Sequence, residues 1–273
     1  MERNIFGAII GDIVGSRFEW HNCKSINFDL FAENCKPTDD TIMTIAVAEW
    51  LSTGQELAKL LYKWGNAYPN AGYGGLFRKW LLKGKPEDLK PYNSYGNGSG
   101  MRVSPCGFFA TSLDEALELA QKSAEITHNH PEGIKGAQAI ASAIFLSRAG
   151  YEKAEIKLFI ERSFGYDLSR TCDEIRPTYN FDVSCQGSCP EAIIAFLEST
   201  DYESAIRLAI SLGGDSDTIA CMTGGMAGAF YGVPANIIEQ ALPYLDNHQT
   251  TAIEKFINIC QSRPILRTNL EHR

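Results

Sequence analysis

The sequence predicts an all-α fold in a single domain over residues 1–273. Apolar residues recur at helical spacing along most of the chain, and no series of short alternating strands is visible, so we expect sheet to be minor or absent. Hydrophobic residues make up 44% of the chain and charged residues 21%, which is typical of a folded globular protein. Two irregular segments, 85–104 and 166–189, have the composition of ordered loops rather than linkers, and we expect them to form a rim over the functional site.

The chain begins with an apolar run over residues 5–10 that Gly11 and Asp12 interrupt. This run is too short for a signal-peptide core, so we expect no targeting segment and a cytoplasmic protein. Eight cysteines without a CxxC pair agree with a reducing compartment. Cys185 and Cys189 could pair as i,i+4 neighbours on a helix, although the compartment favours reduced thiols.

A strong helical pattern follows Asp39 and Asp40. Ile42, Ile45 and Trp50 share one helical face, while Met43 and Val47 cover another. We therefore expect this helix to be buried on nearly all sides.

The later helical patterns carry ordinary start and stop signals. They cover residues 55–68, 74–84, 114–127, 132–149, 152–164, 190–199, 202–212, 215–231, 235–245 and 250–262. Pro131 and Pro190 each precede a glutamate, and proline fits the first turn of a helix. The uncharged run over residues 218–238 contains several glycines and Pro234, so we expect a close-packed core helix that ends before Pro234 rather than a membrane span.

Two acidic signatures stand at predicted helix starts, Thr38–Thr41 and Gly213–Thr218. Clustered carboxylates repel one another and are costly to bury unless cations neutralise them. Carboxylate and hydroxyl oxygens suit Mg²⁺, Mn²⁺ or Ca²⁺ rather than zinc or copper. Either signature alone is typical of a helix cap. Because both lead into apolar helices, together they predict a hard-metal site drawn from both ends of the chain.

Five motifs in one order resemble the ADP-ribosylglycohydrolase family along most of the chain. They are Gly7–Gly15 with Glu19, Thr38–Thr41, Gly96–Pro105, Thr127–His128 with Pro131, and Ile210–Ala220. Each motif is weak evidence alone, but the ordered set is specific. The resemblance implies a compact orthogonal bundle of helices around two Mg²⁺ ions, with Mn²⁺ as an alternative ion.

The resemblance also assigns roles to the acidic residues. It implies metal ligands at Thr38, Asp39, Asp40, Asp215, Asp217 and Thr218. Catalysis would involve Asp39, Asp40 and Asp217 together with Glu19, which corresponds to an acidic residue on a mobile loop in some family members. Glu19 would act as a base or position the attacking water, and the alternative is an exposed loop carboxylate beside Trp20.

The glycine-rich segment Gly96–Arg102 is the expected cradle for ribose and pyrophosphate, because glycine lets backbone N–H groups approach phosphate closely. The substrate-binding residues expected there are Asn97, Gly98, Ser99, Gly100 and Met101. His128 matches a family position near the substrate, and the alternative is a hydrogen-bonded structural histidine. Arg102 would contact phosphate or form a structural salt bridge. Four tyrosines could stack on adenine or only pack: Tyr92, Tyr95, Tyr166 and Tyr179.

The activity implied by the resemblance is Mg²⁺-dependent hydrolysis of an N- or O-glycosidic bond to ADP-ribose. The expected substrate is an ADP-ribosylated protein, with arginine as the first candidate. Serine-, nucleobase- or O-acetyl-linked conjugates and a non-catalytic ADP-ribose-binding role are the alternatives. A phosphatase is disfavoured, because Ile219 stands where Asp-x-Asp phosphatases carry Thr or Val.

The charge balance bears on the partners. A net charge of −8 argues against a basic nucleic-acid groove as the main binding surface. We expect a monomer that binds an ADP-ribosylated protein or a small ADP-ribose conjugate, with no membrane partner.

Overall fold

The computed structural model describes residues 4–83, 89–266 and 270. Within these residues the protein is all-α, as predicted, and an isolated bridge between Gly96 and Ser184 is the only strand-like pairing. The elements in chain order are α1 (Phe6–Gly15), α2 (Asp39–Thr53), α3 (Leu57–Ala67), α4 (Gly75–Leu81), α5 (Gly98–Met101), α6 (Ser104–Phe109), α7 (Leu113–Glu125), α8 (Pro131–Arg148), α9 (Lys153–Phe164), α10 (Cys172–Ile175), α11 (Cys185–Glu198), α12 (Tyr202–Ser211), α13 (Ser216–Tyr231), α14 (Ala235–Ala241), the 3-10 helix η2 (Leu242–Tyr244) and α15 (Asn247–Gln261).

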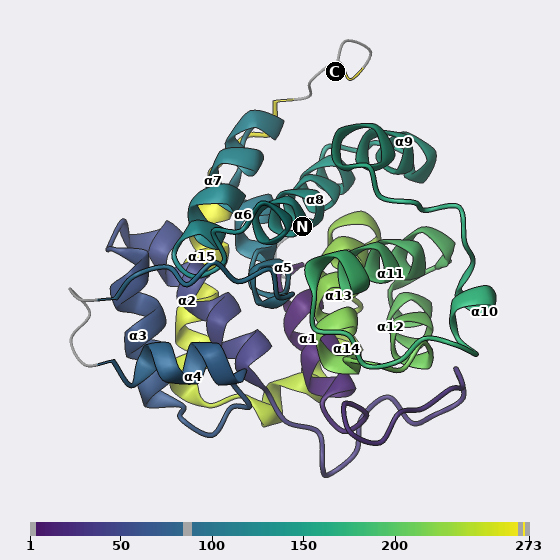
Figure 1. Cartoon of the computed structure of the whole chain (residues 1–273), viewed down its shortest axis with the longest axis horizontal. Coiled ribbons are helices and arrows are strands. Elements are labelled where there is room, and N and C mark those ends of the chain that lie inside the picture. The colour runs from purple at the N-terminus through teal and green to yellow at the C-terminus, as the bar shows by residue number, and fades with distance from the viewer. Residues whose placement is uncertain (1–3, 84–88, 267–269, 271–273) are drawn as a thin grey trace.

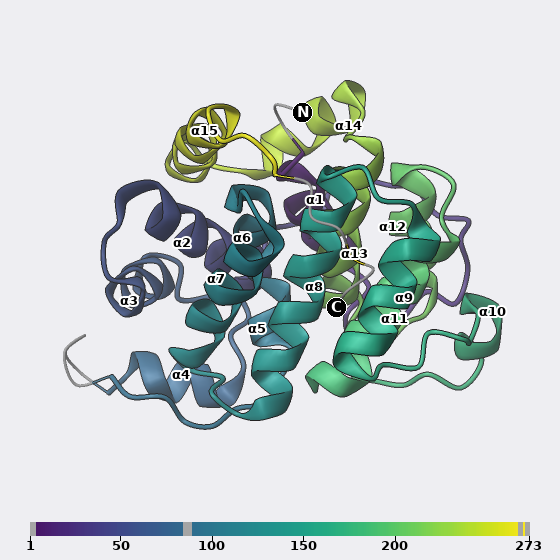
Figure 2. The same cartoon turned by 90° about the horizontal axis from the view of Figure 1, so that it is seen from above.

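Helices α1 and α13 lie side by side in the middle of the molecule (Figure 1). Helices α2, α3 and α4 lie to one side of this pair and α9 to α12 to the other, an arrangement that also holds in the perpendicular view (Figure 2). Every residue of α13 from 216 to 229 is buried, so this helix is the centre of the core.

Three glycines on one face of α1 allow the close packing against α13. A side chain at Gly7 would meet the Gly224 carbonyl oxygen at 2.3 Å, and one at Gly11 would meet the Ala220 carbonyl oxygen at 2.0 Å. Gly7, Gly11 and Gly15 are spaced by four residues, so they line one face of the helix. No helix was predicted over residues 5–15, yet α1 runs through Gly11 and Asp12 because its glycine face fits against another backbone.

Of the other helices predicted from the sequence, some are confirmed and one begins at a different residue. Helix α2 is buried at every residue from 40 to 48, and α13 ends before Pro234, as predicted. Helix α11 begins five residues before Pro190, with Ser184 accepting a hydrogen bond from the Gly187 N–H as its cap, so the expected start at Pro190 is wrong. The short helices α5 and α10 lie inside the two segments predicted as irregular.

No helix in the described part of the chain combines the length and apolar character needed to cross a membrane. All eight cysteines are free thiols, and Cys185 and Cys189 both lie on α11 without a disulfide. The potential pair therefore exists as two neighbouring reduced residues.

Candidate active site

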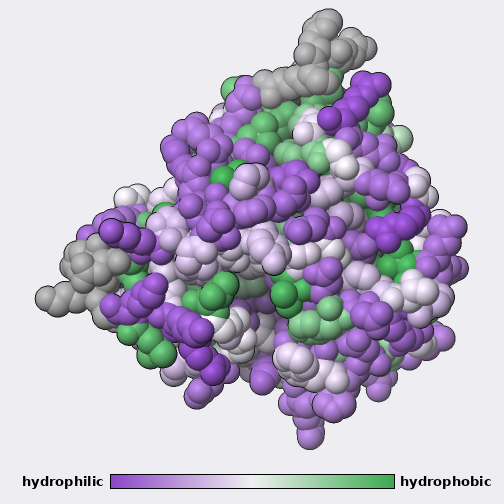
Figure 3. Space-filling view, viewed as in Figure 1, coloured by the Kyte–Doolittle hydropathy of each residue, from purple (hydrophilic) through white to green (hydrophobic). Residues whose placement is uncertain are grey.

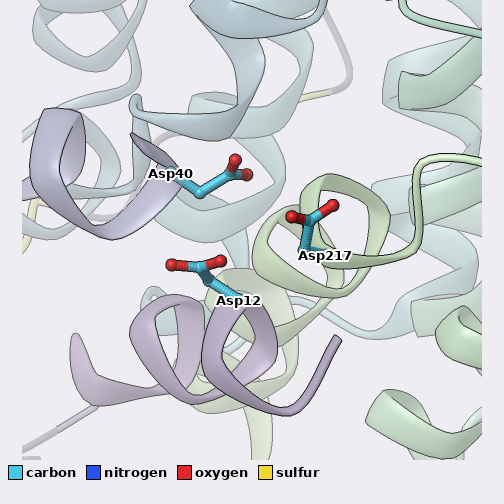
Figure 4. Close-up of side chains that lie close together, drawn as sticks. All are labelled: Asp12, Asp40 and Asp217. Atoms are coloured by element: carbon cyan, nitrogen blue, oxygen red, sulfur yellow. The ribbon is translucent and has the colours of Figure 1, made fainter. Parts of the chain in front are cut away.

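Carboxylates from three helices converge at the centre of the bundle. One oxygen each from Asp12 on α1, Asp40 on α2 and Asp217 on α13 lies within 4.8 Å of the others, and all three residues are buried (Figure 4). A second group, with the same mutual separation, joins Glu19 and Asp215 to Asp217. Asp217 therefore belongs to two adjoining clusters, each of which could hold a cation.

Asp12 fixes the start of α2. Its carboxylate accepts hydrogen bonds from the Thr38 backbone N–H at 2.9 Å, the Thr38 hydroxyl at 2.6 Å and the Thr41 backbone N–H at 3.0 Å, and from the Thr41 hydroxyl as well. The first backbone N–H groups of a helix lack partners within the helix, so a carboxylate from another helix can cap them. This contact holds Asp40 in the opening turn of α2, facing Asp217.

The second signature is held by loop contacts at the start of α13. Gly213 and Gly214 have φ values of 75° and 69°, in the left-handed region that glycine adopts without strain. Asn22 donates to the Gly214 carbonyl and accepts from the Gly214 N–H, both at 2.9 Å. Asn97 donates to the Asp215 carboxylate at 2.7 Å, which ties the glycine-rich segment to the acidic cluster.

A direct hydrogen bond joins the two signatures. The Thr218 hydroxyl donates to Asp40 Oδ2 at 3.1 Å. The other oxygen, Asp40 Oδ1, is buried and has no hydrogen-bond partner among the described residues. A buried carboxylate oxygen without a donor is costly unless a cation approaches it, so this oxygen set fits a hard divalent ion.

The pKa values of the carboxyl groups in the site are raised. Burial, followed by neighbouring carboxylates, raises the pKa of Asp39, Asp40 and Asp217. Burial also raises the pKa of Asp215, opposed by the hydrogen bond from Asn97. Burial and the Asp215 charge raise the pKa of Glu19 to about 7.

A cavity of about 490 Å³ opens beside the carboxylates, within the range of small-molecule sites. Ten of the predicted site residues line it: Glu19, Asp39, Asp40, Asn97, Gly98, Met101, His128, Asp215, Asp217 and Thr218. Both predicted rim segments contribute to its wall, through residues such as Tyr92 and Val183. Among the four tyrosines considered for adenine, Tyr92 is the one that lines this cavity.

Three predicted site residues are not among those that line the cavity. Thr38 caps α2 through its contacts with Asp12. Ser99 is fully buried, and its hydroxyl donates to the Gly133 carbonyl at 2.7 Å. A side chain at Gly100 would meet the Met222 sulfur at 2.9 Å. Ser99 and Gly100 thus press the glycine-rich segment against the core rather than facing the cavity.

His128 and Arg102 are buried residues that line the cavity. The His128 ring hydrogen-bonds the Thr127 hydroxyl at 2.7 Å, and burial, with the Arg102 charge, lowers the pKa of His128, so the imidazole is neutral. Arg102 is buried and donates to the Ser123 carbonyl at 2.8 Å and to the Thr127 hydroxyl at 2.9 Å. The expected salt bridge at Arg102 is replaced by these neutral hydrogen bonds.

Asp12 is the functional residue that sequence reasoning did not assign. It is the one charged residue between Ile5 and Ser16, and it is fully buried. A lone carboxylate inside an apolar helix needs a partner in the core, and that was the available signal.

The chain is similar in sequence and fold to known proteins. A family model described as ADP-ribosylglycohydrolase matches residues 4–264. The chain is 27% identical over 307 residues to ADP-ribosylhydrolase ARH3 of Mus musculus, covering 83% of this chain and 82% of that protein. It is 28% identical over 271 residues to ADP-ribosylarginine hydrolase Tri1 of Pseudomonas putida (strain GB-1), covering 84% and 70%. A solved ADP-ribosylglycohydrolase-related protein complex has the same fold, with a TM-score of 0.70, 23% identity and coverage of 95% and 96%.

Proposed function

The chain belongs to the ADP-ribosylglycohydrolase family, and from this we propose that it removes ADP-ribose from a modified protein side chain, with arginine as the first candidate. Membership makes it a hydrolase of ADP-ribose conjugates. The observation that carries the proposal is the convergence of Asp12, Asp40 and Asp217 beside a cavity that also exposes Glu19. A cytoplasmic location, a monomeric state and a single domain over residues 1–273 stay predictions.

We propose two Mg²⁺ ions, or Mn²⁺, as the cofactor. The two carboxylate clusters that share Asp217 support two neighbouring positions, and the unpartnered Asp40 Oδ1 supports a cation at one of them. The proposed ligands are Thr38, Asp39, Asp40, Asp215, Asp217 and Thr218. When bound, such ions would orient the vicinal hydroxyls of the ribose and polarise a water molecule.

The chain's own residues supply the other elements of the reaction. Glu19 is partly buried and lies within reach of Asp215 and Asp217, so its carboxylate is placed to accept a proton from the attacking water. Asn97 holds the Asp215 carboxylate in place. As the water oxygen bonds to the anomeric carbon, the bond from that carbon to the side chain breaks through an oxocarbenium-like transition state, and the proton that Glu19 accepts balances the one that the leaving side chain gains.

The substrate cradle follows from the residues on the cavity wall. Asn97, Gly98, Met101 and His128 line it, and they are proposed to contact the ribose and pyrophosphate. A side chain at Gly98 would approach His128 Nε2 to 2.9 Å, so glycine keeps the backbone close to the imidazole. Ser99 and Gly100 are proposed to act by positioning this segment against α8 and the core.

A panel of defined conjugates tests the proposal. Arginine-, serine-, nucleobase- and O-acetyl-linked ADP-ribose would each be incubated with the protein and Mg²⁺, Mn²⁺ or a chelator, and released ADP-ribose measured. We expect turnover of the arginine conjugate with either metal and none with chelator. Binding of ADP-ribose without turnover of any conjugate would identify a non-catalytic binding protein and overturn the proposal.

A further inference from the structure

Two stacked aromatic side chains at the cavity have no part in the reaction as derived above. Trp20 follows α1 and Phe181 precedes α11, yet their ring centroids are 5.2 Å apart with planes inclined by 19°. Both line the cavity. Trp20 is 72% exposed and Phe181 44%, so the pair presents aromatic surface to solvent.

Exposed apolar surface is concentrated around this opening. Of nine large apolar side chains that are exposed in the described part of the chain, four line the cavity: Trp20, Leu76, Phe181 and Val183. The face seen in Figure 3 is mostly hydrophilic, with small apolar patches beside a hollow near its middle. Single exposed apolar residues are common, but a group around one cavity marks a contact surface for a ligand.

The aromatic pair lies at the acidic end of the cavity. Both of its loops are anchored on Gly214, the residue before Asp215. Asn22 makes two hydrogen bonds to the Gly214 backbone, and the ring of Tyr179 lies 2.5 Å from the position that a Gly214 side chain would take. Trp20 also directly follows Glu19, whose carboxylate belongs to the cluster. The scissile bond must lie beside these carboxylates, so the pair adjoins the leaving group.

On the basis of the proposed function, we infer that Trp20 and Phe181 bind the leaving side chain and select a planar cationic one, the guanidinium of arginine. Aromatic faces attract guanidinium through stacking and cation–π interaction. A serine hydroxyl offers neither a planar surface nor a charge. These two residues would thus determine which linkage is hydrolysed.

The charge around the cavity is compatible with that choice. Of the described residues that line it, five are acidic, and Arg102 alone is basic, with its Nη2 donating to Ser123 and Thr127. Two bound divalent cations would offset most of the negative charge, so the aromatic faces rather than net charge would carry the selection.

Kinetics of three variants on one linkage, together with their binding of free ADP-ribose, test this assignment. Trp20→Ala and Phe181→Ala should raise KM for an ADP-ribosylarginine peptide about tenfold, the change expected from losing an aromatic contact with a cation. The maximal rate should change less than KM, and Trp20→Phe should restore KM. Binding of free ADP-ribose, measured by thermal shift with Mg²⁺, should be unchanged, because this ligand lacks the leaving group.

Leu158→Ala is the matched control, since Leu158 is 45% exposed on α9 and lies outside the cavity. An unchanged KM in both alanine variants would overturn the inference, as would equal losses for ADP-ribose and the arginine conjugate. Hydrolysis by the parent protein of serine or nucleobase linkages alone would also overturn it. Absence of turnover on every conjugate would instead mean that the proposed function has failed.

Discussion

The carboxylate of Asp12 on α1 caps α2 through Thr38, accepting a hydrogen bond from its backbone N–H at 2.9 Å and from its hydroxyl at 2.6 Å. The same α1 packs on α13 through its glycine face. One helix thus sets the positions of both acidic signatures, because it binds the start of α2 on one side and α13 on the other.

Asp12→Asn should therefore weaken both stability and metal binding. The amide group has one acceptor oxygen where the carboxylate has two, so it cannot accept the hydrogen bonds that Thr38 and Thr41 donate to both oxygens of Asp12. Loss of buried hydrogen bonds of this kind costs about 1–3 kcal/mol. Urea unfolding measures the change, with Asp201→Asn as the control, since Asp201 caps α12 at the surface and asparagine is an equally good cap. Equal stability of the two variants would contradict the role given to Asp12.

Gly11→Ala should destabilise the protein because the new methyl group would meet the Ala220 carbonyl oxygen at 2.0 Å. The contact is between backbone atoms, which cannot rotate away as a side chain can. The loss in the free energy of unfolding should therefore reach or exceed the roughly 1–3 kcal/mol that is usual for overpacking. Gly75→Ala is the comparison, since nothing lies within 4 Å of a side chain at that position. Thermal melting of both variants measures the difference. A Gly11→Ala variant that melts with the parent would mean that α1 and α13 are less tightly packed than described.

The dependence of stability on pH should change with Mg²⁺. The folded pKa values of Asp40 and Asp217 are raised, and that of Glu19 is raised to about 7, so the folded protein holds more protons than the unfolded chain between about pH 4 and 7. With chelator, these groups should therefore lower stability as pH rises through that window. Mg²⁺ should remove much of this loss, because it neutralises the ionised carboxylates.

Urea unfolding at pH 5, 6, 7 and 8, with Mg²⁺ or chelator, measures this effect. His128 contributes with the opposite sign, since its lowered folded pKa costs stability as pH falls below about 6.5. That contribution is common to both conditions, so the difference between them isolates the carboxylates. A stabilisation by Mg²⁺ that does not grow with pH would contradict the assignment of these carboxylates as ligands.

Glu19→Gln should separate chemistry from binding. Glutamine keeps the size of the side chain but cannot accept a proton, so turnover should fall by about 10²–10⁴ if Glu19 acts on the attacking water. Affinity for ADP-ribose should change much less. Steady-state kinetics and thermal shift on one preparation measure the two quantities. Unchanged turnover would return Glu19 to the role of a solvated loop carboxylate.

Much of the fold and part of the site could be predicted from the sequence. Helical periodicity is a local property, so helices such as α2 and α13 appeared where expected, whereas α1 was not predicted and α11 begins earlier than predicted. Each acidic signature alone is typical of a helix cap, and the two could be linked because both lead into apolar helices. Their predicted meeting corresponds to the hydrogen bond between Thr218 and Asp40.

The remaining features depend on contacts between distant segments. Gly11 ends an apolar run in the sequence, and only its contact with Ala220 shows why it lies inside a helix. The role of Asp12 depends in the same way on its hydrogen bonds to the distant residues Thr38 and Thr41. The sequence of the glycine-rich segment does not tell which residues face the cavity, so Ser99 could not be told apart from Gly98. Arg102 pairs with Ser123 and not with an acid, for a reason visible only in the packing of α7.

The central claim is that the two acidic signatures hold cations that in turn hold the ribose at the scissile bond. Thermal shifts with ADP-ribose and AMP, each with Mg²⁺ or chelator, test it most directly, since AMP lacks that ribose. A ligand that binds the folded protein raises its melting temperature by mass action. The account predicts a larger shift with ADP-ribose than with AMP, and a dependence on Mg²⁺ for ADP-ribose only. Equal shifts for both ligands under all conditions would contradict it.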